Sequence, residues 1–257
     1  MLTQLETAIT NLRQLKPLVL CLTNYVTMDL MANSLLALGA SPLMSVCDDE
    51  LEELIKIAQV VTINIGTLDH DFIARCQKAI DYAAQHNKPI ILDPVGAGAS
   101  KMRTQHAREF LGHANIIRGN ASEINALLDD LSLTRGVDTS HSVEQTKDKA
   151  HQLAVGYQCT VVISGKEDFI TDGKRETSLS FGSPLMPLVT GMGCTLTAII
   201  AAFRAVITDE FEAAKLATSF VGLCGNLAHL KSTAPGSFRT TFIDELYKAD
   251  FELMNVK

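Results

Sequence analysis

The sequence predicts an α/β sandwich of three layers, in which a mainly parallel central sheet is flanked by helices. Short β-branched runs alternate with longer amphipathic runs along most of the 257 residues, and this alternation is typical of that architecture. The β-branched runs are almost continuously apolar, as in parallel strands that are buried on both faces. No internal repeat and no Pro/Gly/Ser-rich linker divides the sequence. We therefore expect residues 1–257 to form a single domain.

The predicted elements follow one another from the N-terminus. The first is a helix, because Thr3 and Glu6 have the spacing of a capping box, and Leu5, Ile9 and Leu12 follow at helical intervals. Apolar runs then predict five strands: Leu18–Leu22, Val60–Ile65, Pro89–Leu92, Ile116–Ile117 and Thr160–Ser164. Amphipathic runs predict three helices: Thr27–Leu38, Leu51–Gln59 and Phe72–His86. Three further helical patterns close the chain, at about residues 194–207, 210–230 and 240–252.

Composition excludes several classes of protein. Lys and Arg number 22 against 29 Asp and Glu, a net charge of −7, and aromatic residues make up only 5% with no Trp. This disfavours nucleic acid as a partner, because its binders need basic patches and stacking side chains. The first residues lack the pattern of a signal peptide, and apolar stretches such as 196–203 fall short of the about 20 residues that span a bilayer. The six cysteines are scattered without a C-x-x-C pair, so we expect a cytoplasmic protein with no membrane partner.

Small or polar residues follow the predicted strands. They lie at 23–24, 66–67, 93–96, 118–120 and 164–166. Each segment alone is ordinary turn chemistry. In open α/β sheets, however, ligands bind beyond the carboxyl ends of the strands. Five such segments in one sheet therefore indicate a ligand-binding edge.

The strongest local signal is Gly191-Met192-Gly193-Cys194, which directly precedes the helical run TLTAIIAAFRAV. Two glycines before a helix expose backbone N–H groups and the positive end of the helix dipole, which together favour an anion. A Walker A motif is absent, and a tight turn into a buried helix remains the alternative reading. A left-handed backbone is expected at Gly193. Since Cys194 stands at a helix N-terminus, its thiol pKa is expected to be lowered.

Two carboxylates are candidates for a metal site. Asp93 ends an apolar strand, where a charge needs a partner or a metal ion. Glu123 begins a helix and predicts either a Mg²⁺ ligand or a capping-box partner of Asn120. Arg118, two residues before Asn120, is placed to contact phosphate, with a surface salt bridge as the alternative.

Read together, these features resemble the hydroxyethylthiazole kinase family, which belongs to the ribokinase-like superfamily. The resemblance extends from about Pro17 to His229 and rests on six segments in order: CLTNYVTMDLMANSLLALGASPLMS, INIGTL, PIILDPVGAGAS, IIRGNASEI, VVISGKEDFITDG and VTGMGCTLTAIIAAF. It implies a ribokinase-like fold and ATP-dependent phosphorylation of the hydroxyl group of 4-methyl-5-(2-hydroxyethyl)thiazole in thiamine biosynthesis or salvage. It also implies a homotrimer with sites at the subunit interfaces.

The resemblance assigns roles to individual residues. It places Cys194 beside the substrate hydroxyl, where related kinases carry an aspartate base, and makes Gly193 part of an anion hole. Four positions are implied to contact the thiazole: Met44, Gly191, Asn24 and Gly66. Arg118 and Ser164 are implied to contact ATP, although threonine is more usual at the second of these positions. Asp93 and Glu123 match the Mg²⁺ region.

Two other functions remain open at this stage. A thiol hydrolase would use Cys194 as its nucleophile, but it needs a nearby histidine, and no motif nominates one of the seven histidines. A non-catalytic protein would keep the fold and bind thiazole or nucleotide without turnover, in keeping with the missing aspartate. A dehydratase of the same superfamily is a lesser third possibility.

Overall fold

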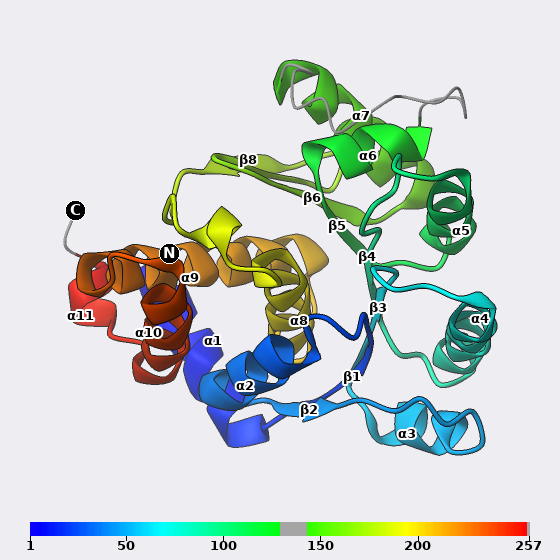
Figure 1. Cartoon of the computed structure of the whole chain (residues 1–257), viewed down its shortest axis with the longest axis horizontal. Coiled ribbons are helices and arrows are strands. Elements are labelled where there is room, and N and C mark those ends of the chain that lie inside the picture. Colours follow the sequence, from blue (N-terminus) through cyan, green and yellow to red (C-terminus); the bar gives the residue numbers. More distant parts are fainter. Residues whose placement is uncertain (129–142, 256–257) are drawn as a thin grey trace.

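The computed structural model describes residues 1–128 and 143–255. Within these residues, a single sheet of eight strands forms the centre of the protein, in the order β2-β1-β3-β4-β5-β6-β7-β8 (Figure 1). The strands are β1 (Leu18–Leu22), β2 (Ser41–Leu43), β3 (Val60–Asn64), β4 (Ile90–Asp93), β5 (Ile116–Asn120), β6 (Thr160–Ser164), β7 (Asp168–Thr171) and β8 (Glu176–Leu179). Pairing is parallel from β2 across to β6, and antiparallel only between β6, β7 and β8. The prediction of a mainly parallel sheet is confirmed.

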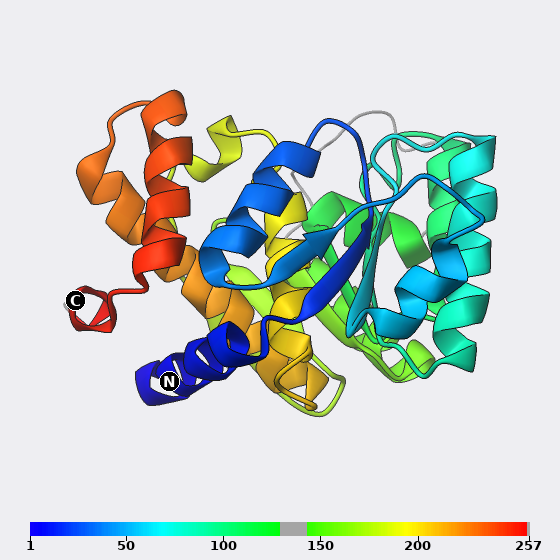
Figure 2. The same cartoon turned by 90° about the horizontal axis from the view of Figure 1, so that it is seen from below.

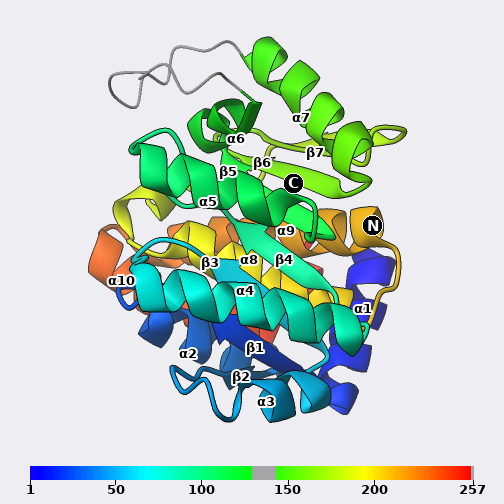
Figure 3. The ribbon, with the colours of Figure 1, turned by 90° about the vertical axis from the view of Figure 1, so that its right-hand side faces the viewer.

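Helices cover both faces of the sheet (Figures 1, 2 and 3). One face carries α3 (Leu51–Ile57), α4 (His70–Gln85), α5 (Lys101–Leu111), α6 (Ala121–Leu128) and α7 (Val143–Tyr157). The other carries α1 (Leu2–Leu15), α2 (Met28–Leu38), α8 (Met192–Arg204), α9 (Glu210–Lys231), α10 (Pro235–Lys248) and α11 (Phe251–Met254), with the 3₁₀ turn η1 at Met186–Leu188. The predicted three-layer sandwich is therefore confirmed.

The strands bury side chains on both faces because their sequences are apolar throughout. In β1, Val19 and Cys21 pack into the core beneath α8, whereas Leu20 and Leu22 pack into the core beneath α4. This alternation is the two-residue period of a strand. A strand with one polar face would leave one of the two helical layers without an apolar partner.

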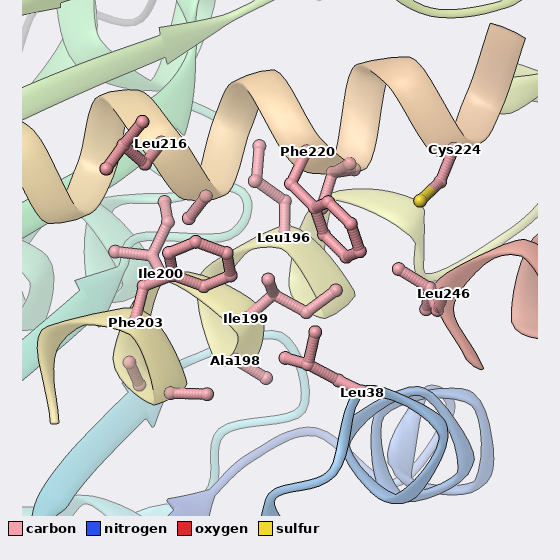
Figure 4. Packing of buried hydrophobic residues seen from close by; sticks show 14 of the residues in the cluster. Leu38, Leu196, Ala198, Ile199, Ile200, Phe203, Leu216, Phe220, Cys224 and Leu246 are labelled. Carbon is pink, nitrogen blue, oxygen red and sulfur yellow. The ribbon is translucent and has the colours of Figure 1, made fainter. Parts of the chain in front are cut away.

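The helix α8 fixes the position of the predicted Gly-Met-Gly-Cys segment. Its side chains Ile199, Ile200 and Phe203 are fully buried and pack against Phe220 of α9 and neighbouring apolar residues (Figure 4). A helix that is apolar on nearly all sides must be buried. Residue 192, the first of α8, is consequently held in place by the core behind it.

Four expectations about the boundaries of the first helix and of the strands are wrong. The helix α1 begins at Leu2 with Met1 at its N-cap and no side-chain cap, so Thr3 lies inside the first turn and no capping box forms. The strand predicted at residues 116–117 extends to Asn120, which places Arg118 inside β5 rather than after it. The strands predicted to end at residues 65 and 92 end at 64 and 93.

Further differences concern elements that were not predicted and the boundaries of helices. No prediction covered β2, β7, β8, α5 or α7, whose polar residues weaken the apolar periodicity, and for α6 only a start near Glu123 was predicted. The helix expected from residue 194 begins at Met192, and the one expected over 240–252 is two helices separated by Ala249, which has a left-handed backbone (φ 46°). Within the described ranges, none of the helices has the length and apolar character needed to cross a membrane.

Candidate active site

Most of the predicted site residues meet at the carboxyl edge of the parallel strands. Five of them come from or directly after successive strands: Asn24, Gly66, Asp93, Arg118 and Ser164. The N-terminal half of α8 lies against the same edge, because Cys194 contacts Asn24 after β1 and Thr197 bonds to Asp93 at the end of β4. The expectation of a polar crevice at this edge therefore corresponds to a real cluster of side chains.

Cys194 is joined to the end of β1 through Asn24. The amide Nδ2 of Asn24 lies 3.4 Å from Cys194 Sγ and donates to Asn64 Oδ1 at 2.9 Å. The backbone N–H of Thr27 donates to Asn24 Oδ1 at 3.1 Å. Because that backbone donor requires an acceptor, it fixes which end of the Asn24 amide faces the thiol. Cys194 thus receives an N–H rather than a carbonyl oxygen.

The same chain of hydrogen bonds continues to Asp93. Asn64 Nδ2 donates to Asp93 Oδ2 at 2.8 Å, and Thr197 Oγ1 donates to the same oxygen at 2.8 Å. The backbone N–H of Gly66 donates to Asn64 Oδ1 at 3.0 Å and so fixes this second amide as well. A continuous buried path therefore connects the Cys194 thiol, two amides and the Asp93 carboxylate.

Asp93 is fully buried, and its Oδ1 has no hydrogen-bond partner among the described residues. Burial raises the pKa of Asp93 from 3.8 to about 6. Arg118 opposes that rise, the charge of Glu123 adds to it, and the hydrogen bonds from Thr197 and Asn64 oppose it again. A buried carboxylate with one unpartnered oxygen is costly for stability, which is a common property of functional sites.

Arg118 occupies the space between Asp93 and the end of β6. Its Nη1 lies 3.7 Å from Asp93 Oδ2, and its Nη2 donates to Ser164 Oγ. The residue is only 8% exposed, so the surface salt bridge considered from the sequence is excluded. A methyl group added at Gly193 would lie 2.5 Å from Nη1. The guanidinium group therefore packs directly over the first turn of α8.

Glu123 makes the capping interactions that the sequence offered as its alternative reading. Its Oε2 accepts the backbone N–H of Asn120 at 2.9 Å, and Asn120 Oδ1 accepts the N–H of Glu123 at 2.9 Å. Its Oε1 also accepts the backbone N–H of Gly96 at 2.9 Å, two residues beyond Pro94 in the loop after Asp93. Glu123 thus ties the start of α6 to the loop that follows β4.

The expected lowering of the Cys194 pKa is wrong. Burial raises the pKa of this thiol, and the nearby charge of Asp93 raises it further, against smaller opposing contributions from Thr27, Asn64 and Arg118. The helix N-terminus is a local influence, whereas desolvation and a buried carboxylate act more strongly here. At neutral pH the thiol is protonated.

The two glycines of the segment have different roles from those expected. The left-handed residue is Gly191 (φ 95°), where an added methyl group would also lie 2.9 Å from Thr27 Cγ2. Gly193 has helical conformation, so the expectation of a left-handed backbone there is wrong. The first helical hydrogen bond is donated by Thr195 to Gly191 O. The N–H groups of Gly193 and Cys194 precede it, as the anion-hole reading requires.

Met44 stands apart from this hydrogen-bonded cluster. It follows β2, the edge strand beside β1, and its partly buried side chain packs against the core beneath α2 and α8. Gly66 is closer to the centre, since an added methyl group would lie 2.9 Å from Asn24 Cβ. Gly66 therefore forms a wall beside Asn24.

Two members of the cluster, Asn64 and Thr197, were missed by the sequence analysis. Asn64 lies within a run that was assigned to a strand, although a polar side chain two residues before Gly66 signals a strand end. Thr197 is three residues after Cys194, and helical spacing alone places both on one face of α8. Its bond to Asp93, however, depends on a contact between residues 104 positions apart.

The carboxylates fit a magnesium ion only with help from other ligands. No group of three or more His, Cys, Asp or Glu side chains in the described ranges gathers at metal-binding distance. Asp93 Oδ1 is free to ligate, and each Glu123 oxygen holds a single backbone N–H and retains a lone pair. Mg²⁺ binds in enzymes through one or two carboxylates with water and substrate phosphates, and these residues fit that arrangement.

The fold is one that known small-molecule kinases share. The fold resembles that of Bacillus subtilis pyridoxal kinase in an ADP complex, with a TM-score of 0.60, 16% identity and coverage of 81% of this chain and 91% of the other. At such low identity the likeness concerns the fold alone.

Closer relatives specify the family. The model of the hydroxyethylthiazole kinase family matches residues 9–252. A hydroxyethylthiazole kinase from Chlamydia felis is 52% identical over 99% of this chain and 98% of its own length, and one from Aliivibrio salmonicida is 45% identical over 96% and 94%. The solved hydroxyethylthiazole kinase protein of Pyrococcus horikoshii has a TM-score of 0.91, with 36% identity over 99% of this chain and 97% of that one. The chain belongs to the hydroxyethylthiazole kinase family.

Proposed function

We propose that the protein transfers the γ-phosphoryl group of ATP to the primary alcohol of 4-methyl-5-(2-hydroxyethyl)thiazole in thiamine biosynthesis or salvage. The observation that carries the proposal is the placement of Arg118 over Gly193, directly beside Cys194, in a chain that belongs to this kinase family. A cation, free helix N–H groups and a thiol then surround one point at the carboxyl edge of the sheet. We also propose that residues 1–257 fold as one domain.

The roles of the cluster follow from the charges that phosphoryl transfer develops. Its transition state is loose and spreads negative charge over the phosphoryl oxygens, so catalysis depends mainly on positioning and on positive groups. Arg118, with Ser164 beside it, is assigned to the ATP phosphates. The N–H groups of Gly193 and Cys194 are assigned to the transferred phosphoryl group. The Cys194 thiol lies beside the acceptor alcohol and assists its deprotonation only weakly, because its raised pKa keeps it protonated.

The neutral thiazole is assigned to the Asn24 side of the cluster. Asn24 and Gly66 form one wall, Gly191 begins the helix beside it, and Met44 supplies an apolar contact from the edge strand. The Asn24 amide uses its N–H groups within the cluster, toward Asn64 Oδ1 and Cys194 Sγ, so this wall is polar but uncharged. An uncharged ring and a hydroxyl group suit such surroundings.

Mg²⁺ is proposed at Asp93 and Glu123. When bound there, the ion neutralises charge on the nucleotide phosphates. Asp93 contributes its unpartnered oxygen, while Glu123 keeps the loop at Gly96 close to the start of α6.

The proposed function is tested by measuring ATP consumption and product mass across a panel of alcohols that includes hydroxyethylthiazole and hydroxymethylpyrimidine. We expect phosphorylation of the thiazole alcohol at the highest kcat/KM in the panel. Thiazole binding without turnover would instead identify the non-catalytic protein considered above. ATP hydrolysis without a phosphorylated alcohol would favour the dehydratase.

Cys194→Ala is expected to retain kinase activity, reduced by no more than about 100-fold, the low end for an acid–base group in a loose transfer. The thiazole KM should change little, and Cys194→Asp, which supplies the carboxylate of related kinases, should retain more activity than the alanine variant. Rates of both variants, measured with saturating ATP, check this. If both variants are inactive, the assignment of Cys194 as an auxiliary group is wrong.

The thiol hydrolase predicts a different result for the same residue. It requires a covalent adduct on wild-type Cys194, which mass spectrometry detects. Among the groups that interact with this thiol in residues 1–128 and 143–255, the polar partners are Asn24, Thr27, Asn64, Asp93 and Arg118, and none is a histidine. The raised thiol pKa also opposes nucleophilic attack.

Glu123→Gln is expected to lower turnover by ~10–100-fold, the usual effect of losing a group that orients a metal ligand. The new amide cannot accept both backbone N–H groups, and the negative charge is lost. Thiazole affinity should be nearly unchanged, and excess Mg²⁺ should restore part of the rate. Titration of turnover with Mg²⁺ checks this, with Glu109→Gln on the exposed side of α5 as the control. Wild-type turnover at ordinary Mg²⁺ would leave Glu123 with a capping role only.

The proposal extends to assembly and location. Tyr25, Val26 and Val46 are exposed apolar residues that follow β1 and β2 near the site, which supports a homotrimer with sites at the subunit interfaces. All six cysteines are free thiols, which supports a cytoplasmic location.

A further inference from the structure

Arg103 spans the two sides of the candidate site. Its Nη1 donates to Ile65 O at 2.8 Å and to Val95 O at 3.0 Å, and its Nη2 donates to Gly66 O at 2.9 Å. Ile65 and Gly66 follow β3, while Val95 follows β4. One guanidinium group therefore binds three backbone carbonyls from two neighbouring strand ends. No site assignment above includes this residue.

The position of Arg103 within its helix is locally unfavourable. It occupies the first turn of α5, where Ser100 caps the helix by accepting the N–H of Arg103 at 3.3 Å, and that turn contains no acidic residue. Cations are disfavoured at this positive end of a helix dipole. The three hydrogen bonds to carbonyl groups offset this cost. Local helix preferences alone do not explain an arginine at this position.

The loop after β4 is shaped around this side chain. Gly96 has a left-handed backbone (φ 78°), and a methyl group added there would lie 3.0 Å from Arg103 Cδ. The N–H of Gly96 is held by Glu123, and the preceding strand ends in Asp93. Fixing Val95 and Gly96 therefore also fixes the proposed nucleotide and metal side of the site.

The loop after β3 is held from both sides of one residue. The side chain of Asn64 accepts the N–H of Gly66, and Arg103 donates to the carbonyl oxygen of Gly66. Gly66 in turn packs against Asn24, which contacts Cys194. Fixing Gly66 therefore fixes the proposed thiazole side.

We infer that Arg103 is a positioning residue that sets the separation between the thiazole wall at Gly66 and the nucleotide loop at Val95–Gly96. The inference rests on the proposed kinase function for its kinetic consequence. In-line transfer requires the alcohol and the phosphoryl group at contact distance, and a misplacement of about 1 Å costs about 100-fold in rate. Lysine is a poor substitute, because a single ammonium group cannot reproduce a planar fork that binds three carbonyls.

The kinetic test compares Arg103→Met and Arg103→Lys with Arg108→Met. Arg108 lies on the same helix, and its Nη2 donates to Ala126 O at 2.8 Å in α6, so the control also removes a carbonyl contact of α5. We expect Arg103→Met to lower kcat/KM for the thiazole by about 100-fold. The kcat/KM of Arg103→Lys should lie between those of Arg103→Met and wild type, and that of Arg108→Met should stay close to wild type. Arg103→Ala is a third variant of this residue. Guanidinium ions, well below unfolding concentrations, should partly restore its kcat/KM but should not change the kcat/KM of Arg108→Met.

Hydrogen exchange supplies a readout that is independent of activity. In Arg103→Met, amides of residues 64–67 and 95–98 should exchange faster than in wild type, because local opening becomes easier where a bridging group is lost. In Arg108→Met these two segments should be unchanged. If Arg103→Met does not fold, Arg103→Lys and the guanidinium-treated alanine variant carry the same comparison.

The outcomes separate the inference from the proposed function. Absence of thiazole phosphorylation by the wild-type protein would refute the function, and the exchange experiment would still decide the role of Arg103. Wild-type kcat/KM together with unchanged exchange at both segments in a folded Arg103→Met variant would overturn the inference. Equal kinetic losses in Arg103→Met and Arg108→Met would also overturn it, because the effect would then be general to α5.

Discussion

Gly193→Val is expected to lower kcat/KM by at least ~100-fold, the loss of about one oxyanion-hole donor, while the fold is retained. The reason is the position of Arg118: an added Cβ at residue 193 would lie 2.5 Å from its Nη1 and 2.7 Å from its Nη2. These atoms end a flexible side chain, so they move rather than the backbone. A displaced guanidinium group then leaves Asp93 and Ser164, and the branched side chain fills the space assigned to the phosphoryl group.

The smaller Gly193→Ala substitution tests the same argument with less disturbance. Its single methyl group already reaches the guanidinium, so a clear loss of activity is expected, with ATP affinity affected more than thiazole affinity. Gly156→Ala is the matched control, because a methyl group added in α7 at that position meets nothing within 4 Å. Steady-state kinetics with circular dichroism check both variants. Full activity in a folded Gly193→Val protein would refute the anion-hole assignment.

The layers of the fold could be predicted because their signals are local. A run such as Leu18–Leu22 is apolar at every position, and the helix 28–38 ends at Gly39, whose backbone is left-handed (φ 107°). Such patterns report the immediate surroundings of each residue. The hairpin of β7 and β8 escaped prediction because both strands are short and begin with an acidic residue, and only Leu179 of β8 is apolar.

Residues of the site could be predicted only where the neighbouring sequence carries a signal for them. Cys194 and Arg118 each stand beside a glycine, Gly193 and Gly119, so sequence reasoning found them. The pKa of the Cys194 thiol could not be obtained in that way, because Asp93 and burial reverse the effect of the helix N-terminus. Asn64 and Arg103 were missed for the same reason. Their partners are 29 residues away at Asp93 and 38 residues away at Ile65.

Asp93→Asn is expected to stabilise the ligand-free protein at pH 8 while lowering kcat by at least about 100-fold, the scale of a lost charge-stabilising contact. Burial raises the pKa of Asp93 to about 6 from an ordinary value of 3.8. Above pH 6 the folded protein therefore carries an ionised carboxylate that is more stable in the unfolded chain. The difference corresponds to about 3 kcal/mol as an upper limit, from which the altered hydrogen bonds of the new amide subtract.

The pH dependence of that stabilisation gives the decisive measurement. Between about pH 4 and pH 6 the folded protein binds a proton at Asp93 that the unfolded chain has lost, so this group's contribution to stability falls as the pH rises through that window. Asn cannot titrate, so the advantage of Asp93→Asn should be smallest near pH 4, grow up to about pH 6 and stay constant above it. Thermal unfolding of both proteins across this range, without nucleotide or Mg²⁺, measures the difference. Burial also raises the pKa of Asp168 to about 6, but this residue is present in both proteins, so its contribution cancels in the comparison.

A variant that is less stable than wild type at pH 8 would mean that Arg118, Asn64 and Thr197 more than compensate for the burial of the charge. A variant that keeps wild-type turnover would remove Asp93 from the proposed nucleotide and metal site.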